Sequence, residues 1–170
     1  MGELYMKIIL GDITKIKADA NVNAASADLM PQPGISSAIY AAADGELLKM
    51  LCKRIGHCRI GHAVATSSCG LSAKYIIHVA GAGWYGGKKR ERMLMEQCYL
   101  NALQKGWLIG CKSIAVPLIF SGVCHMPRAE SIGIAGQAIQ KFEERHPEIQ
   151  VLLVLYRRGI YEMALRILNK

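Results

Sequence analysis

The sequence is poor in proline and aromatic residues, and it has no apolar run long enough to cross a bilayer. It contains 5 Pro, and Phe, Trp and Tyr together make up 6% of the 170 residues. A transmembrane helix needs about 20 consecutive apolar residues, and the longest runs, 75–83 and 149–156, are shorter or interrupted. With 52% hydrophobic and 20% charged residues, the composition excludes disordered and collagen-like chains. No basic-then-apolar leader opens the sequence, so we expect a cytoplasmic protein without a membrane partner.

The cysteines lack the spacing of a zinc ribbon or a thioredoxin-like redox motif. No Cys-x-x-Cys pair is present, and those two classes depend on such pairs. Several of these cysteines lie in apolar periodic segments, where a thiol behaves as a small hydrophobic group. We therefore expect buried, reduced thiols, no metal site and no cofactor. The six cysteines are Cys52, Cys58, Cys69, Cys98, Cys111 and Cys124.

Acidic residues are outnumbered, with 13 Asp and Glu against 21 Lys and Arg, and the formal net charge is +8. Such a surplus favours anionic partners, from nucleotides to nucleic acid. The densest basic run is Lys88-Lys89-Arg90 with Arg92. Neither an aromatic pair typical of RNA-binding sheets nor a recognition helix accompanies it. A basic nucleic-acid-binding module therefore remains an alternative.

Strand and helix patterns alternate along the chain. Short aliphatic runs bounded by turn residues predict strands, and apolar residues at spacings of three and four predict helices. The alternation predicts an α/β fold with a mixed or largely parallel sheet in one domain, 1–170. In such folds ligands bind at the carboxyl ends of the strands. The predicted strands are 6–10, 63–67, 75–80, 112–117 and 149–156, and the predicted helices are 36–55 with a break at Gly45, 93–108, 129–145 and 161–168. A further short apolar run, 20–24, is interrupted by Asn21 and Asn23.

A glycine motif, Gly81-Ala82-Gly83-Trp84-Tyr85-Gly86, follows a predicted strand and precedes a predicted helix. This spacing is that of a dinucleotide-binding turn. It follows a late strand, however, and the bulky Trp84 and Tyr85 stand where a pyrophosphate approaches the backbone. No acidic residue ends the next strand to bind a ribose. An NAD(P)-dependent enzyme is therefore a weaker alternative.

Asp12, in Gly11-Asp12-Ile13-Thr14, comes directly after the first predicted strand. A carboxylate in a pocket accepts a hydrogen bond from an amino group such as the exocyclic amine of adenine. Such an acceptor discriminates strongly between bases, because the wrong base leaves it unpaired. The alternative is that Asp12 or Thr14 only caps a turn or a short helix.

Two further loops each lead into a predicted helix. The first runs from Val22-Asn23-Ala24-Ala25-Ser26 through Pro31-Gln32-Pro33-Gly34-Ile35, with Ser36 or Ser37 as the expected helix cap. The second is Phe120-Ser121-Gly122-Val123-Cys124. Backbone N–H groups at a helix start suit a phosphate. Two such loops facing each other would hold a diphosphate from both sides.

Together these motifs resemble the macrodomain family, whose members are ADP-ribose-binding α/β/α modules. The resemblance is nearest to the bacterial group related to O-acetyl-ADP-ribose deacetylases and mono-ADP-ribosyl hydrolases. It implies a three-layer α/β/α fold with a mixed central sheet, and ADP-ribose or an ADP-ribosylated protein as partner. The matching stretches are 11–14, 22–25, 38–42, 73–78, 113–117 and 121–123.

The resemblance also implies roles for particular residues. Asp12 would bind the adenine amine, with the Ile13 backbone beside it, and Tyr156 would stack on the adenine ring. The other implied ligand-binding residues are Asn23 and Ser26 in the Asn-Ala-Ala segment, Gly34, Ile35 and Ser36 in the first phosphate loop, and Ser121, Gly122, Val123 and Cys124 in the second.

The sequence departs from the hydrolytic macrodomains where catalysis would occur. Ser26 replaces a second Asn that contacts the distal ribose, and Ser36 replaces an Asp that activates water. Pro31 and Pro33 cannot donate backbone hydrogen bonds to a phosphate. Two mechanisms remain: activation of water by the diphosphate of the substrate, or proton transfer by His125. The sequence therefore predicts ADP-ribose binding, and leaves open whether the chain hydrolyses an ADP-ribosyl ester or only binds it.

Overall fold

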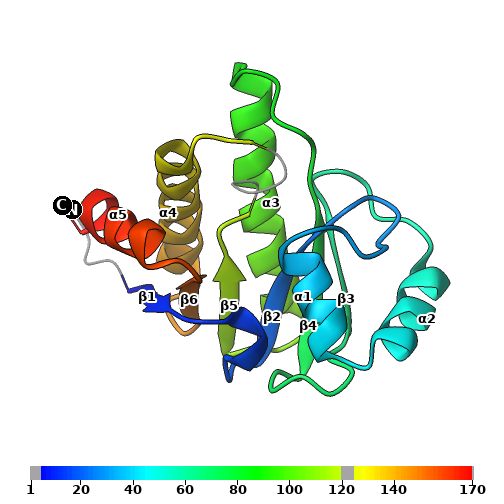
Figure 1. Cartoon of the computed structure of the whole chain (residues 1–170). Helices are drawn as coiled ribbons and strands as arrows, with labels where there is room; N and C mark the ends of the chain where they lie inside the picture. The colour runs from blue at the N-terminus through cyan, green and yellow to red at the C-terminus, as the bar shows by residue number, and fades with distance from the viewer. Residues whose placement is uncertain (1–4, 120–124, 170) are drawn as a thin grey trace.

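The computed structural model describes residues 5–119 and 125–169, apart from the side chain of Lys89. Within these ranges six strands form one sheet in the order β1-β6-β5-β2-β4-β3 (Figure 1). Neighbouring strands are parallel except for β3, which pairs antiparallel with β4. The predicted mixed sheet is therefore confirmed. The strands are β1 (Lys7–Leu10), β2 (Ala20–Ala25), β3 (Ala63–Ser67), β4 (Tyr75–Ala80), β5 (Ser113–Pro117) and β6 (Gln150–Leu155).

Helices cover both faces of the sheet, which gives the predicted three layers (Figure 1). Alternate residues of the central strands serve the two cores, because successive strand side chains point to opposite faces. Ile114 and Val116 of β5 pack toward α3, α4 and α5, whereas Ala115 packs toward η1 and α1. The helices are α1 (Ile35–Ala42), α2 (Gly45–Ile55), α3 (Lys89–Leu108), α4 (Arg128–Arg145), α5 (Arg158–Leu168) and the 3-10 helix η1 (Ile13–Lys15).

The predicted helical segment 36–55 is divided at Gly45 into α1 and α2. Asp44 caps α2 by accepting a hydrogen bond from Leu47 N at 3.1 Å. A Cβ on Gly45 would lie 2.7 Å from the carbonyl oxygen of Tyr40, so only glycine fits this junction. The expected cap of α1 was wrong: Gly34, with φ of 91°, holds that position instead of Ser36 or Ser37. Glycine adopts this backbone conformation without the strain that a side chain would add.

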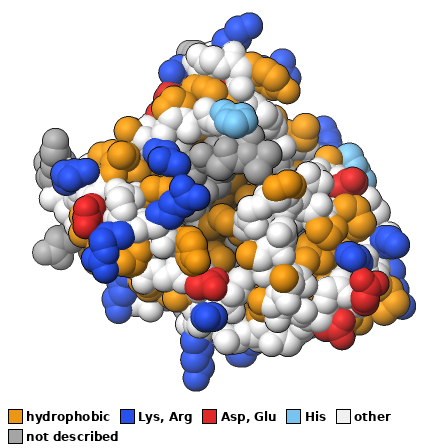
Figure 2. All heavy atoms as spheres, viewed as in Figure 1, with side chains coloured by type: hydrophobic (Ala, Val, Ile, Leu, Met, Phe, Trp, Pro, Cys, Tyr) orange, Lys and Arg blue, Asp and Glu red, His pale blue; other side chains and the backbone are white. Residues whose placement is uncertain are grey.

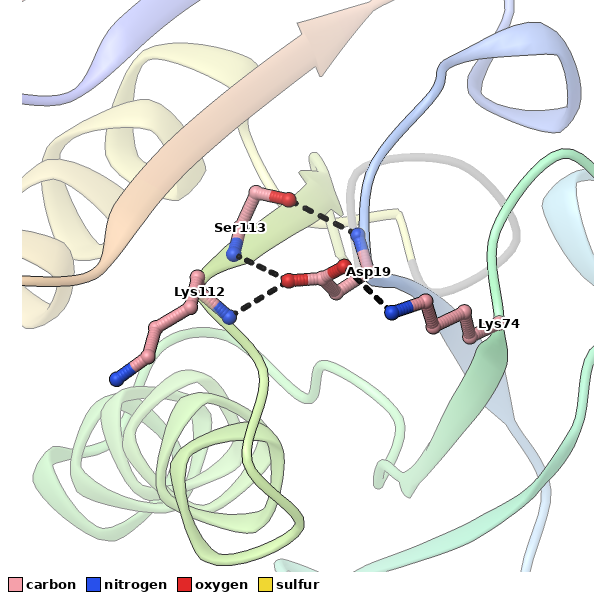
Figure 3. A network of polar contacts seen from close by, with 4 residues as sticks. All are labelled: Asp19, Lys74, Lys112 and Ser113. Carbon is pink, nitrogen blue, oxygen red and sulfur yellow. Dashed lines mark hydrogen bonds and ion pairs between the residues drawn. The ribbon is translucent and has the colours of Figure 1, made fainter.

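Asp19 joins the amino ends of three adjacent strands, at the edge of the sheet opposite to the expected ligand site (Figure 3). Its Oδ2 accepts hydrogen bonds from Lys112 N at 2.7 Å and Ser113 N at 3.2 Å. The Nζ atom of Lys74 lies 3.7 Å from Oδ1. These backbone hydrogen bonds, with the Lys74 charge, lower the pKa of the Asp19 carboxyl. Polar contacts of Asp19 therefore hold the amino ends of β2, β4 and β5 together.

The cysteines that the structure describes are all buried, and no disulfide joins any two of them. Burial raises the pKa of Cys111 to about 11 and also raises the pKa of Cys52. These thiols are therefore protonated near neutral pH, as expected for core positions. Cys124 lies outside the described residues. Of the helices described, none has the length and apolar character needed to cross a membrane.

Candidate functional site

A cavity of about 730 Å³ opens at the carboxyl edge of the sheet. Figure 2 shows the corresponding hollow near the centre of this face. Segments that follow five adjacent strands line it, namely 11–13, 24–26, 81–83, 117–118 and 155–157. Strands in a sheet lie about 4.8 Å apart, so five of them span about 19 Å. The cavity is therefore long enough for an elongated ligand.

Asp12 and Tyr156 define one end of this cavity. Asp12 caps η1, and its Oδ1 accepts hydrogen bonds from Thr14 N at 2.9 Å and from Thr14 Oγ1 at 2.7 Å. No other described residue donates to Asp12 Oδ2, which remains available to a ligand. Because β1 pairs with β6 in register, Gly11 N bonds to Leu155 O at 2.9 Å and the two following segments lie together. The Tyr156 side chain is exposed, at 78% of its accessible area, and is available for stacking.

Ser26 and the segment Gly81–Gly83 lie toward the other end of the cavity, after β2 and β4. The Ser26 hydroxyl donates to Asp28 Oδ1 at 2.5 Å. Its lone pairs are thus free to accept a hydrogen bond from a ligand hydroxyl or a water. The same contact, together with a bond from Met30 N at 3.0 Å, lowers the pKa of Asp28.

The loop before α1 forms part of the cavity wall through Gln32, Pro33, Gly34 and Ile35. Nothing lies within 4 Å of the position that a Cβ on Gly34 would occupy, so the backbone there faces open space. Among the first backbone N–H groups of α1, those of Ser37 and Ala38 bond to Gln32 O and Gly34 O, whereas those of Ile35 and Ser36 have no backbone partner among the described residues. This segment is therefore the described part of the molecule best suited to a phosphate.

The predicted ligand-binding residues separate into three groups. Six of them line the same cavity: Asp12, Ile13, Ser26, Gly34, Ile35 and Tyr156. Asn23 and Ser36 are buried outside its lining, and Ser36 Oγ accepts a hydrogen bond from Gln32 N at 3.1 Å. Ser121, Gly122, Val123 and Cys124 lie outside the described residues.

The two candidate catalytic groups of the sequence do not line the cavity. The Ser36 side chain is buried beside the loop before α1. His125 is exposed and has a φ of 57°, in the left-handed region. Asp12 is the one carboxylate in the described lining, and it lies at the Tyr156 end. No set of three His, Cys, Asp or Glu side chains in the described ranges is placed to hold a metal ion.

Asn23 holds His78 inside the core, where both side chains are buried. Asn23 Nδ2 lies 3.1 Å from His78 Nδ1, and Thr66 Oγ1 lies 3.0 Å from His78 Nε2. Because Thr66 Oγ1 donates to Ser67 O, it accepts from a protonated Nε2. Desolvation lowers the pKa of His78 to about 4. The ring is therefore neutral and ties β2, β3 and β4 together beneath the cavity.

Reasoning from sequence missed Gln32, Arg128 and Arg157 as cavity residues. Arg128 is the first residue of α4, and Arg157 is the cap of α5. Figure 2 shows basic side chains at one margin of the hollow. Both arginines stand directly before or at a helix start that follows a strand. That position relative to the strands was the signal that could have indicated them.

Residues 81–83 of the glycine motif line the cavity, but the fold around them is not the dinucleotide-binding one. Here β1 is an edge strand, whereas the first strand of a Rossmann sheet is central. Glu91 accepts hydrogen bonds from Tyr85 N at 2.9 Å and Gly87 N at 2.8 Å, which closes the turn. The basic run that follows is partly neutralised, since Arg92 pairs with Glu130 and packs over Trp84.

Comparison with known proteins identifies the family to which this chain belongs. A family model described as Macro domain matches residues 22–135. The O-acetyl-ADP-ribose deacetylase of Salmonella typhimurium (strain LT2) is 39% identical over 170 residues, covering 97% of this chain and 94% of the relative. That of Escherichia fergusonii is 40% identical over 155 residues, covering 88% and 86%. The chain therefore belongs to the Macro domain family.

Solved structures agree with this assignment. The Oceanobacillus iheyensis macrodomain with ADP superposes with a TM-score of 0.89 at 32% identity, covering 95% of this chain and 88% of that one. The Trypanosoma brucei macrodomain in complex with ADP-ribose has a TM-score of 0.86 at 24% identity, covering 95% and 68%. The second likeness concerns the fold alone, and both confirm the expected α/β/α architecture.

Proposed function

We propose that this protein binds ADP-ribose in the cavity at the carboxyl edge, with adenine at the Asp12 and Tyr156 end. The distal ribose then lies toward Ser26 and Gly81–Gly83. The observation that carries the proposal is the placement of six expected ligand residues around one cavity that spans five strands. The relatives named O-acetyl-ADP-ribose deacetylase and the solved macrodomain with ADP support the same ligand class.

The proposed reaction is hydrolysis of an ester at the distal ribose, as in O-acetyl-ADP-ribose or in ADP-ribose attached to a protein carboxylate. Water adds to the ester carbonyl, and the bond between that carbon and the ribose oxygen breaks. A diphosphate oxygen of the substrate takes one proton of the attacking water and passes it to the ribose oxygen, which leaves as a hydroxyl while the acid keeps the OH of the water. The substrate supplies the base because Asp12, the carboxylate in the described lining, lies at the opposite end. Ser26 positions the water or the ribose through its hydroxyl.

A non-catalytic ADP-ribose binder is the second candidate. The position at which hydrolytic relatives carry an Asp is Ser36, whose hydroxyl is occupied by the bond from Gln32 N. A buried, neutral hydroxyl is a poor general base at neutral pH. In this case the cavity would hold the product and leave an ester intact.

Titration calorimetry of ADP-ribose, followed by an assay of O-acetyl-ADP-ribose turnover, tests both candidates. We expect micromolar binding by the wild type and a loss of roughly tenfold or more in Asp12→Ala, because a charged hydrogen bond is removed. Asp44→Ala is the matched control: Asp44 also caps a helix, yet it lies away from the cavity. No heat from the wild type would overturn the proposal, and binding without turnover would select the second candidate.

A further inference from the structure

Three arginines lie at the amino ends of two neighbouring helices, α4 and α5. Arg128 opens α4, Arg157 caps α5, and Arg158 follows it. Arg128 and Arg157 line the cavity, and Arg158 does not. No carboxylate of the described residues forms an ion pair with any of the three. The described lining of the cavity therefore contains two cationic side chains and one carboxylate, Asp12, which forms no ion pair with either of them.

Their position in the two helices makes this cluster more electropositive. The amino end of a helix carries a partial positive charge, so a cation there is unfavourable for the helix itself. Both α4 and α5 begin with such a cation, and the first turn of α5 contains no acidic residue. An anion bound between the two arginines would remove their mutual repulsion and pair with both helix ends.

The topology places Arg157 at the adenosine end of the cavity, with Arg128 at the start of the neighbouring helix α4, which follows the next strand, β5. Arg157 directly follows Tyr156 at the end of β6, the strand beside β1 and Asp12. The loop before α1, which we assign to the diphosphate, lies over the opposite face of the sheet from α4 and α5. A ligand with its adenine between Asp12 and Tyr156 would therefore turn its adenosine ribose toward Arg157.

We infer that this end of the cavity binds a phosphate monoester carried by the adenosine ribose, in addition to the diphosphate. The inference rests on the proposed function, since it takes the adenine end from it. Guanidinium groups bind phosphate oxygens in a bidentate, charge-assisted manner, and a monoester carries close to two negative charges. The ligand class is an adenine nucleotide phosphorylated on the ribose 2′ or 3′ oxygen, such as ADP-ribose 2′-phosphate.

Calorimetry with matched pairs of ligands tests the inference. The pairs are AMP with adenosine 2′,5′-bisphosphate or adenosine 3′,5′-bisphosphate, and ADP-ribose with ADP-ribose 2′-phosphate. In the wild type we expect the added phosphate to raise affinity by about tenfold at low salt, with a smaller gain at high salt. In Arg157→Gln and Arg128→Gln the gain should fall below about threefold, whereas Arg158→Gln should retain it.

The outcomes separate this inference from the proposed function. If ADP-ribose binds and neither added phosphate raises affinity, the inference is wrong and the proposed function stands. If Arg157→Gln weakens ADP-ribose and its 2′-phosphate by the same factor, the arginines bind the diphosphate, and the inference is again overturned. If the phosphorylated nucleotides bind and ADP-ribose does not, the cationic subsite is supported and the proposed ligand needs replacement. Failure of every adenine nucleotide to bind overturns both.

Discussion

Thr14 fixes the carboxylate of Asp12 by donating to a single oxygen, Oδ1, from both its backbone nitrogen and its hydroxyl. The sequence Gly11-Asp12-Ile13-Thr14 allowed two roles for Asp12, a helix cap or a ligand-binding group. Asp12 is placed for both, since it caps η1 and also lines the cavity. The cap uses one oxygen and leaves the other for a ligand. The orientation of Asp12 is thus set before a ligand arrives, which lowers the entropic cost of recognising it.

Base discrimination tests this arrangement. Adenine donates from its exocyclic amine to Asp12, whereas hypoxanthine presents an oxygen there and would repel the carboxylate. We expect the wild type to bind ADP-ribose at least about tenfold more tightly than inosine diphosphate ribose. Asp12→Ala should bind both about equally, and Thr14→Val should show an intermediate preference. Equal binding of the two ligands by the wild type would place the base elsewhere.

Ser26 and Asp28 form a second pair, in which Asp28 orients the hydroxyl of Ser26. Because the Ser26 hydroxyl donates its hydrogen bond to Asp28, the serine oxygen can act only as an acceptor toward a ligand in the cavity. In an active enzyme, Ser26→Ala should lower kcat for O-acetyl-ADP-ribose by about tenfold or more, with ADP-ribose binding changed by less than about threefold.

Asp28→Asn should give a smaller loss of kcat, because the amide oxygen of Asn still accepts the hydrogen bond from Ser26. Asp44→Asn is a suitable control, since its carboxylate lies outside the cavity lining. A parallel loss of binding and kcat in Ser26→Ala would assign the hydroxyl to general ligand affinity.

Local patterns predicted most of the fold. The strands 63–67 and 75–80 have the predicted bounds, and most other strands differ by one residue at an end. The helix starts were less accurate, because α3 begins at Lys89 instead of 93 and α5 at Arg158 instead of 161. Polar first turns carry no apolar periodicity, so the pattern detects such a helix only once its buried face begins.

The site could be predicted only in part, for a physical reason. Asp12, Gly34 and Tyr156 belong to motifs that are recognisable along the chain. Arg128 and Arg157 reach the cavity because their helices begin at the same edge of the sheet, which is a property of strand order and not of local sequence. The same strand order removes the dinucleotide interpretation of Gly81–Gly86, since β1 lies at the edge.

Two buried groups should give the folding stability opposite dependences on pH. The pKa of His78 falls from 6.5 to about 4, so between these values only the unfolded chain binds the proton and stability rises with pH. Burial raises the pKa of Glu143 from 4.5 to about 7, so the folded chain keeps a proton that the unfolded chain has released, and stability falls with pH. Each effect amounts to at most about 3 kcal/mol over its window.

Urea unfolding between pH 4 and 7.5 can separate these two effects. Removing the titration of His78 in His78→Gln should leave a stability that falls more steeply with pH than in the wild type. Glu143→Gln should leave one that rises more steeply. Identical pH slopes in all three proteins would show that neither buried group changes its protonation on folding.

Two glycines of α4, three residues apart, should respond oppositely to alanine. Gly133 has no atom within 4 Å of an added Cβ, so Gly133→Ala should stabilise the protein by about 0.5–1 kcal/mol through helix propensity. A Cβ on Gly136 would lie 2.4 Å from Leu168 Cδ2, so Gly136→Ala forces the Leu168 side chain out of its packed position and should cost about 1 kcal/mol or more. Thermal unfolding of both variants, with Leu168→Ala added to each, measures the coupling. The second substitution should rescue Gly136→Ala alone, and equal effects on both variants would show that α5 does not approach α4 this closely.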